Sequence, residues 1–320
     1  MNIKKLLLIP CVLFISACGP TSNPTSDPTI DPTVEPTLDP TTEEPAAKNI
    51  DVIVLAGQSN MEGHSHISEL KKHISDDKYH EYVDGYDEIK MTYKEGCYGS
   101  NNNSNYEFRK VRLGQGCNTS MFGPELGMAE YFHEYKDTLA NEVVFVKFAV
   151  GGTSIYKEWR SPSSVTGSFE KGYLYSPFVN YVHKSMNNLI EAGYNPVLKA
   201  ICWMQGESDG QYAQEYENLE HNFITDVVTD LADYNDETIK FIDAGIYDSS
   251  WVGNPALINK SKIKNVDKDP DNRFYFDTIE ANLEYRNEPE GNPDLFHFDS
   301  ESMIELGKLF ASTIFENAVI

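Results

Sequence analysis

From about residue 49 to the end of the chain, apolar residues follow two alternating patterns. Short runs of β-branched and aromatic residues, each ending at glycine or a polar cluster, predict buried strands. Between them, apolar residues recur at helical spacing, which predicts helices with one packed side. Such alternation is typical of a mostly parallel sheet covered on both faces. We therefore expect one α/β domain over residues 49–320, with strands at 51–56, 143–150, 197–204, 239–246 and 272–280, and helices beginning after Pro124 and spanning 176–192, 212–234 and 300–318.

The stretch 85–121 interrupts this alternation. It is rich in Gly, Asn and Tyr, so it predicts a long polar loop. Loops of this length on an α/β scaffold are often lids or binding edges. We expect this one to influence which substrate the domain accepts.

The first residues predict an export signal rather than part of the fold. Lys4 and Lys5 precede an apolar run at 6–15, which is the pattern of a secretory signal and is too short to span a bilayer comfortably. The run ends in Ile-Ser-Ala-Cys, which resembles the bacterial lipoprotein box. Cleavage after residues 1–17 would make Cys18 the lipidated N-terminus. The alternative is an ordinary signal peptide with a chance cysteine.

Residues 18–48 predict a tether. Over 20–43 the chain repeats a four-residue unit that opens with Pro-Thr, and proline at this spacing excludes a helix or a central strand. We expect an extended spacer between the lipid and the domain, or a linker of no fixed length. The protein would then be exported, and it would be held at the membrane or cell envelope through its lipid anchor alone.

Charge narrows the choice of partners. The chain has 26 Lys and Arg against 50 Asp and Glu, a formal net charge of −24. Nucleic acid is therefore excluded as a main partner, and so is an anionic membrane face.

Cysteine usage agrees with export. Cys97 and Cys117 bracket a Gly/Asn-rich stretch, so a disulfide closing this loop is one expectation and two free thiols are the other. Cys202 lies in an apolar run and is expected in the core.

Polar junctions follow the predicted strands. In open α/β sheets, the carboxyl ends of the strands gather ligands at one edge. Ser59 follows the first strand, and His297 stands before the last helix with Asp294 three residues upstream. A serine hydroxyl needs a base, and the base needs an acid that orients it, so this set fits acyl transfer through Ser59. The N–H groups of Ser59 and Gly152 and the amide of Gln205 are the expected oxyanion donors.

These segments together resemble the blocks of SGNH hydrolases, in the branch that contains sialate O-acetylesterases and the acetylxylan esterases of carbohydrate esterase family six. The resemblance covers nearly all of residues 49–320. It implies a three-layer α/β/α sandwich and a serine mechanism without metal or cofactor. The implied reaction removes O-acetyl groups from carbohydrates such as acetylated xylan or sialic acid. The blocks are GQSNM (57–61), FGPELG (122–127), GGTS (151–154), WMQGESD (203–209) and DLFH (294–297).

The resemblance also implies supporting residues. Glu207 and Asp209 would hold the Gln205 loop, and Gln58 and Asn60 would support the nucleophile. Trp159 and Arg160 are expected to border the pocket, where the indole suits a sugar face and the guanidinium a sugar carboxylate. A surface Trp-Arg pair is the alternative reading.

Two histidines just beyond the nucleophile raise the question of a metal. His64 and His66 lack a clear third ligand, so we expect exposed residues at the start of a helix and no metal site.

Two other functions stay open from sequence. One is a broader SGNH lipase or thioesterase. The other is a non-catalytic, glycan-binding surface lipoprotein on the same fold. The second should have lost Ser59, His297 or an oxyanion donor, and the chain retains all of them.

Overall fold

The computed structural model describes residues 47–320 except 96–101, 168–169, 236–237, 249–250 and 319. The predicted signal, Cys18, the 18–48 tether up to residue 46 and Cys97 lie outside these residues. Lipidation and a Cys97–Cys117 disulfide therefore stay predictions.

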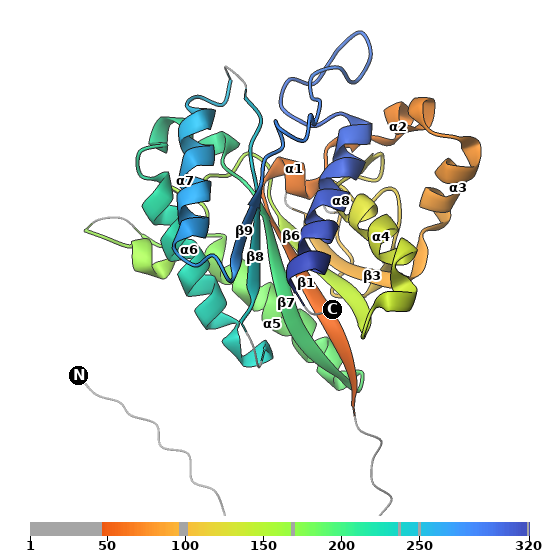
Figure 1. Ribbon diagram of the computed structural model, residues 1–320, viewed down its shortest axis with the longest axis horizontal. Helices are drawn as coiled ribbons and strands as arrows, with labels where there is room; N and C mark the ends of the chain where they lie inside the picture. The colour runs from red at the N-terminus through yellow and green to blue at the C-terminus, as the bar shows by residue number, and fades with distance from the viewer. Residues whose placement is uncertain (1–46, 96–101, 168–169, 236–237, 249–250, 319) are drawn as a thin grey trace, which may run out of the picture. The chain divides into compact units, whose positions relative to one another are not determined.

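A seven-stranded sheet forms the centre of the domain (Figure 1). All of its strand pairs are parallel except β3–β4, which is antiparallel at one edge. A separate antiparallel pair joins β2 (Ser65–His66) to β5 (Met121–Phe122). The order across the large sheet is β4 (Arg109–Val111), β3 (Tyr86–Glu95), β6 (Glu142–Ala149), β1 (Lys48–Gly57), β7 (Tyr194–Met204), β8 (Lys240–Ala244) and β9 (Arg273–Phe276).

Helices cover both faces of this sheet, which confirms the predicted three-layer α/β/α sandwich. On one face lie α5 (Tyr175–Glu191), α6 (Tyr216–Asp230) and α7 (Pro255–Asp267). On the other lie α4 (Glu125–Glu134) and α8 (Ser300–Asn317), and Figure 1 shows α8 in front of the sheet with α5 behind it. Short helices α1 (Ser59–Glu62), α2 (Ile67–His73) and α3 (Asp76–Asp84) follow the first strand.

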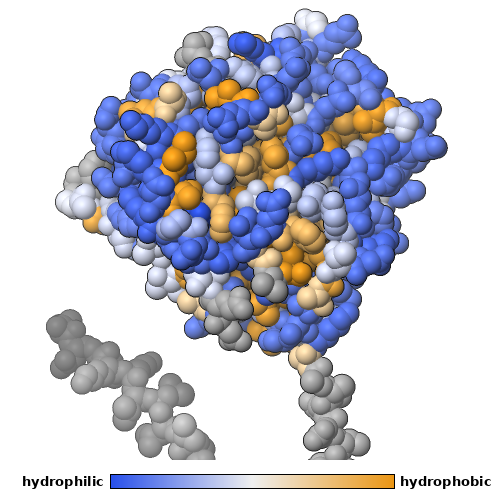
Figure 2. Space-filling model, viewed as in Figure 1, coloured by the Kyte–Doolittle hydropathy of each residue, from blue (hydrophilic) through white to orange (hydrophobic). Residues whose placement is uncertain are grey.

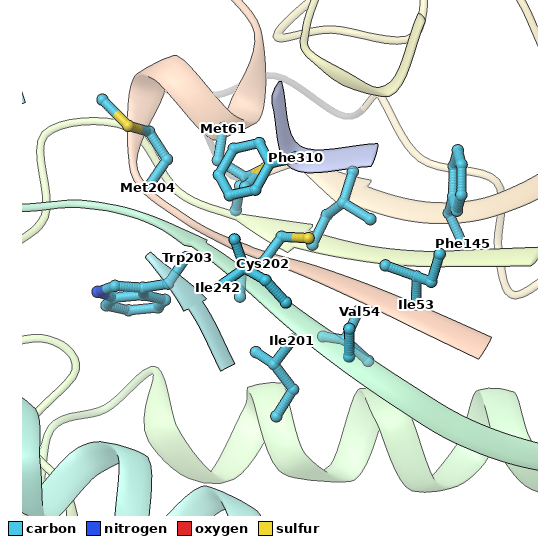
Figure 3. Packing of buried hydrophobic residues seen from close by; sticks show 14 of the residues in the cluster. Ile53, Val54, Met61, Phe145, Ile201, Cys202, Trp203, Met204, Ile242 and Phe310 are labelled. Carbon is cyan, nitrogen blue, oxygen red and sulfur yellow. The ribbon is translucent and has the colours of Figure 1, made fainter. Parts of the chain in front are cut away.

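Strand β1 is buried along almost its whole length because both of its faces are covered. Residues 50–57 are all buried, which explains why this strand is a nearly continuous apolar run. Figure 3 shows Val54 and Ile201 pointing towards a helix on one side of the sheet, while Phe310 of α8 packs from the other. Cys202 is fully buried in this core, as predicted.

The prediction of a continuous polar loop over 85–121 is wrong, because this stretch contains β3. Ile89, Met91 and Tyr93 alternate with polar residues and are buried against the core. Thr92 points to the opposite face and is also buried, with its hydroxyl 2.9 Å from both the Ser104 and Tyr181 hydroxyls. Because buried Thr92 is polar and forms hydrogen bonds inside the protein, the stretch lacks the run of apolar residues by which a buried strand is predicted.

The predicted helix at 212–234 is shorter than expected, and α7 was missed. A 3-10 helix at Glu207–Tyr212 precedes α6, and another at Ala232–Tyr234 follows it. The buried side of α7 carries polar residues, including Lys262, whose ammonium lies 2.5 Å from Asp243 and 3.7 Å from Glu220. Charges on the inward side remove the apolar pattern by which a helix is recognised.

The surface is mainly hydrophilic on the face shown in Figure 2, with apolar residues in separate patches. Among the described residues, no helix combines the length and apolar character needed to cross a bilayer.

Candidate active site

The end of β1 brings Ser59 to the carboxyl edge of the sheet. Gly57 has a φ of +145°, and a Cβ there would lie 2.1 Å from the Met204 carbonyl oxygen. The Gln58 N–H donates to the same oxygen at 2.9 Å. Only glycine permits so close an approach to β7, and the chain then turns directly into α1, which begins at Ser59.

His297 lies on the loop before α8 and is paired with Asp294. Its Nδ1 lies 2.6 Å from Asp294 Oδ2, and the other carboxylate oxygen accepts from the Phe296 N–H at 2.8 Å. Burial raises the pKa of Asp294, but the hydrogen bond and charge of His297 outweigh burial and hold the pKa below its ordinary value. Asp294 is therefore ionised at neutral pH and can orient the imidazole.

Asn60 fixes the His297 loop from both sides. Its Nδ2 donates to Glu207 Oε1 at 2.7 Å and lies 3.5 Å from the Phe296 carbonyl oxygen, and its Oδ1 accepts from the Phe298 N–H at 3.2 Å. Burial raises the pKa of Glu207, although the Asn60 hydrogen bond opposes this shift. Through these hydrogen bonds, Asn60 and Glu207 join the β1 and β7 junctions to the loop that carries His297.

Asp209 joins the β6 and β7 junctions. Its carboxylate accepts from the Ile155 N–H at 2.9 Å, the Tyr156 N–H at 3.0 Å and the Gln205 amide at 2.6 Å. Burial raises the pKa of Asp209 to about 6 in spite of these donors. Gly152, in the loop so held, has a φ of +70°, which favours glycine.

Gln205 does not reach the pocket as expected. It is fully buried, and its Nε2 lies within hydrogen-bond distance of three acceptors, which are Asp209 Oδ2 at 2.6 Å, the Thr153 carbonyl oxygen at 3.1 Å and Gln58 Oε1 at 3.2 Å. An amide has only two N–H bonds, so contacts inside the protein occupy both of them. The predicted role of Gln205 as an oxyanion donor is therefore not supported.

Gln58 lines the pocket instead, with a fixed orientation. Its Oε1 lies within hydrogen-bond distance of the N–H groups of Gly206 (3.4 Å) and Ser208 (3.3 Å), besides the Gln205 amide. Backbone N–H groups can only donate, so the atom that meets them must be the amide oxygen. The Nε2 of Gln58 then faces the opposite way.

A pocket of about 460 Å³ unites these groups. One wall is aromatic, and this aromatic wall consists of Tyr247, Trp251 and Phe296. Trp251 is 66% exposed and Phe296 50% exposed, with ring centroids 6.0 Å apart. The described lining residues are Gln58, Ser59, His64, Gly151, Gly152, Glu207, Ser208, Tyr247, Trp251, Val252, Phe296 and His297.

The aromatic wall was missed in the sequence. Tyr247 and Trp251 follow β8, so the rule that ligands gather at strand carboxyl ends would have pointed to Tyr247 if applied to this strand as well. No sequence pattern singles out Trp251.

A larger hollow of about 610 Å³ lies elsewhere, against α2, α3, α4 and α8. Both lysines that line it are paired, since Lys78 and Lys308 each form an ion pair with Glu130. The described residues that line it include no histidine and no predicted catalytic residue, whereas Ser59 and His297 both line the smaller pocket.

Trp159 and Arg160 do not border the pocket, contrary to expectation. Trp159 is fully buried and makes edge contacts with Phe148, Phe178 and Trp203, so its ring is part of the core. Arg160 is 5% exposed and donates to the Tyr156 and Ser164 carbonyl oxygens, which holds the guanidinium within its own loop.

The expectation that His64 is an exposed residue at a helix start is also wrong. Its ring stacks on that of His297, with centroids 4.2 Å apart, and its Nε2 lies 3.0 Å from Glu62 Oε2. His66 lies in β2 and is partly exposed. Ligand atoms of Glu62, His64 and Cys117 lie within 4.8 Å of one another, but the same Glu62 oxygen also accepts from the Gly151 N–H. Hydrogen bonds between His64, Glu62 and Gly151 account for this arrangement.

Comparisons with known proteins concern the family and the fold of the domain. A family model described as "Carbohydrate esterase, sialic acid-specific acetylesterase" matches residues 49–316. No curated protein matches significantly.

Solved structures share the fold at low identity. A protein from Arabidopsis thaliana (AT4G34215) is 20% identical, with 83% of this chain and 98% of that one covered and a TM-score of 0.56. NanS is 14% identical over 85% and 98% of the two chains, with a TM-score of 0.53. XAC1771, a carbohydrate acetylesterase from Xanthomonas citri, is 15% identical over 84% of this chain and 56% of that one, with a TM-score of 0.54.

The pH dependence of stability in Asp209→Asn tests whether Asp209 links the junctions that follow β6 and β7. Because folding raises the pKa of Asp209 from 3.8 to about 6, the folded state binds this proton more tightly than the unfolded state. The stability of the wild type relative to Asp209→Asn should therefore fall by up to about 3 kcal/mol as pH rises from about 3.5 to about 7. Urea unfolding of both proteins across this range measures the difference, and a difference independent of pH would contradict the prediction.

Proposed function

Because the chain belongs to the carbohydrate esterase family of sialic acid-specific acetylesterases and is a carbohydrate O-acetylesterase, we propose that it releases acetate through Ser59 as nucleophile. The observation that carries the proposal is the convergence of Ser59 and His297 on one pocket, with His297 bound to an ionised Asp294. These are the parts that a serine esterase requires.

The proposed reaction has two halves. In the first, His297 accepts the Ser59 proton while Oγ attacks the acetyl carbonyl carbon. The tetrahedral intermediate then expels the sugar oxygen, which takes the proton from His297 and leaves acetyl-Ser59. In the second, His297 takes a proton from a water molecule as its oxygen attacks the acetyl carbon, and the bond to Ser59 Oγ then breaks as Oγ takes that proton from His297. The product is acetic acid, which becomes acetate by losing its proton to the solvent. Only neutral imidazole can accept a proton, so the rate should fall on acidification.

We assign three donors to the oxyanion. The N–H groups of Ser59 and Gly152 are two of them, and the Nε2 of Gln58 takes the place expected for Gln205. The donors on Gln58 Oε1 support this assignment, because they fix the amide plane with Nε2 on the other side. A donor fixed before the reaction stabilises the charge without the cost of reorganisation.

We propose neutral acetylated sugars, such as acetylated xylan, as preferred substrates over acetylated sialic acid. The described residues that line the pocket include one acid, Glu207, but no Lys or Arg, and Arg160 is bound within its own loop. The undescribed stretches within 47–320 contain no Lys or Arg either. A sialic acid carboxylate would therefore lack a cation and would approach Asp294 and a strongly acidic protein. The aromatic wall suits the apolar face of a sugar.

Two further expectations belong to the same proposal. Export as a lipoprotein through Cys18 would place the esterase outside the cytoplasm, where acetylated glycans occur in polymers.

A broader lipase or thioesterase is the competing activity, and the aromatic wall alone does not distinguish a sugar from an acyl chain.

Ser59→Ala and His297→Ala should each lower kcat for 4-nitrophenyl acetate by on the order of 10⁴-fold, because the two side chains act as one unit. Asp294→Asn should cost less than either if backbone groups also orient the imidazole. Initial-rate assays measure this, with the exposed Ser120→Ala and His80→Ala as matched controls. Full activity in Ser59→Ala would exclude the serine mechanism, and faster turnover of the octanoate ester than of the acetate would favour the lipase.

Gln58→Glu tests the oxyanion assignment. A carboxylate can still accept from Gly206 and Ser208, but it replaces the Nε2 donor by an oxygen that repels the developing charge. We expect kcat to fall by about 10²- to 10³-fold with KM little changed, and a melting curve of the variant checks that it is folded at the assay temperature. Wild-type kcat in this variant would remove Gln58 from the oxyanion site.

A matched pair of substrates tests the preference for neutral sugars. O-acetyl sialic acid and its carboxyl methyl ester carry the same acetyl group and differ in charge. Acetate release from the methyl ester should be about tenfold more efficient in kcat/KM, and added salt should narrow the difference. A preference for the free acid would show that the pocket recognises the carboxylate.

A further inference from the structure

A second histidine–carboxylate pair lies against the first. The rings of His64 and His297 are nearly parallel, with an interplanar angle of 18° and centroids 4.2 Å apart. His64 is bound to Glu62 as His297 is bound to Asp294. The His64 side chain is 13% exposed and lines the pocket, while the Glu62 side chain is fully buried.

The backbone around His64 leaves this ring little freedom. Gly63, with a φ of +96°, packs so closely that a Cβ would lie 2.4 Å from the Gly123 nitrogen. The Gly63 carbonyl oxygen accepts from the Cys117 N–H at 2.8 Å. Glu62 is itself fixed, because Oε2 accepts from the Gly151 N–H at 2.9 Å. One carboxylate therefore holds both His64 and the loop that carries Gly152.

Charges around the stack favour an uncharged His64. Burial lowers its pKa and the neighbouring His297 lowers it further, against the opposing effects of Glu62 and Asp294. From the other side, the Lys147 ammonium donates to the Glu62 carbonyl oxygen at 2.9 Å and pairs with Glu125 at 2.8 Å. An uncharged ring can lie against His297 without repelling it when His297 takes up the serine proton.

His297 needs such a support. It lies on a loop with its side chain 15% exposed, and its described side-chain hydrogen bond is the one to Asp294. A single hydrogen bond through Nδ1 still lets the ring tilt about that atom, which would move Nε2 relative to Ser59. A flat ring against its face restricts this tilt, and small misplacements of a catalytic group are costly in rate.

We propose that His64 is a positioning residue, whose ring stacks on His297 and holds this base in the orientation set by Asp294 while protons pass between Ser59 and the sugar. The inference rests on the proposed serine mechanism. In this proposal, the stacked face of the His64 ring restricts the tilt of His297, and the hydrogen bond to Glu62 holds the His64 ring in place.

Three variants separate the stack from the hydrogen bond. His64→Phe keeps a flat ring, His64→Gln keeps a polar side chain that can reach Glu62, and His64→Ala keeps neither. With 4-nitrophenyl acetate, we expect kcat to fall by about tenfold or more in His64→Ala and His64→Gln and by less than about threefold in His64→Phe, with KM nearly constant. Equal losses in His64→Phe and His64→Ala, or no loss in His64→Ala, would overturn the proposal.

A second measurement does not depend on turnover. The proton between His297 Nδ1 and Asp294 should give a far-downfield ¹H NMR signal, which Asp294→Asn assigns by removing it. The signal should stay sharp in the wild type and His64→Phe, and it should broaden in His64→Ala and His64→Gln at unchanged melting temperature. An unchanged signal in all three His64 variants would refute positioning. Activity in Ser59→Ala would instead refute the serine mechanism, so the two failures are distinguishable.

Discussion

Parallel pairing of β1 with both of its neighbours is the constraint on which the site depends. Gly57, the last residue of β1, is level with Ala149 of β6 and with Met204 of β7. Three strands therefore end at the same height, and the three junctions that follow must share one edge of the sheet. The positions of Ser59, Gly152 and Gln58 are consequences of this register.

Buried polar side chains convert that shared edge into a fixed geometry. Asp209 joins the β6 and β7 junctions, while Asn60 joins the β1 and β7 junctions to the His297 loop. Each of these groups is buried with several hydrogen bonds, so none of the connected loops can shift without leaving a polar atom unsatisfied. The loops therefore behave as one unit.

The sequence was informative where burial alone determined the order of apolar and polar residues. Strands covered on both faces are apolar throughout, so β1, β6 and β7 and the polar junctions after them could be predicted. It was misleading where buried residues are polar: Thr92 in β3 and Lys262 in α7 are satisfied by partners distant in the chain. The same limit applies to the site. The choice between Gln58 and Gln205, the burial of Trp159 and the stacking of His64 all depend on tertiary contacts that spacing does not encode.

The aromatic wall has a consequence for how this domain can diverge. Tyr247, Trp251 and Phe296 belong to the segments after β8 and before α8, whereas the proposed nucleophile and the proposed oxyanion donors follow β1 and β6. Insertions or substitutions at Trp251 would reshape what enters the pocket without moving the edge that carries the chemistry. The segment after β8 therefore offers a place where the shape of the pocket can vary independently of the strand junctions after β1 and β6.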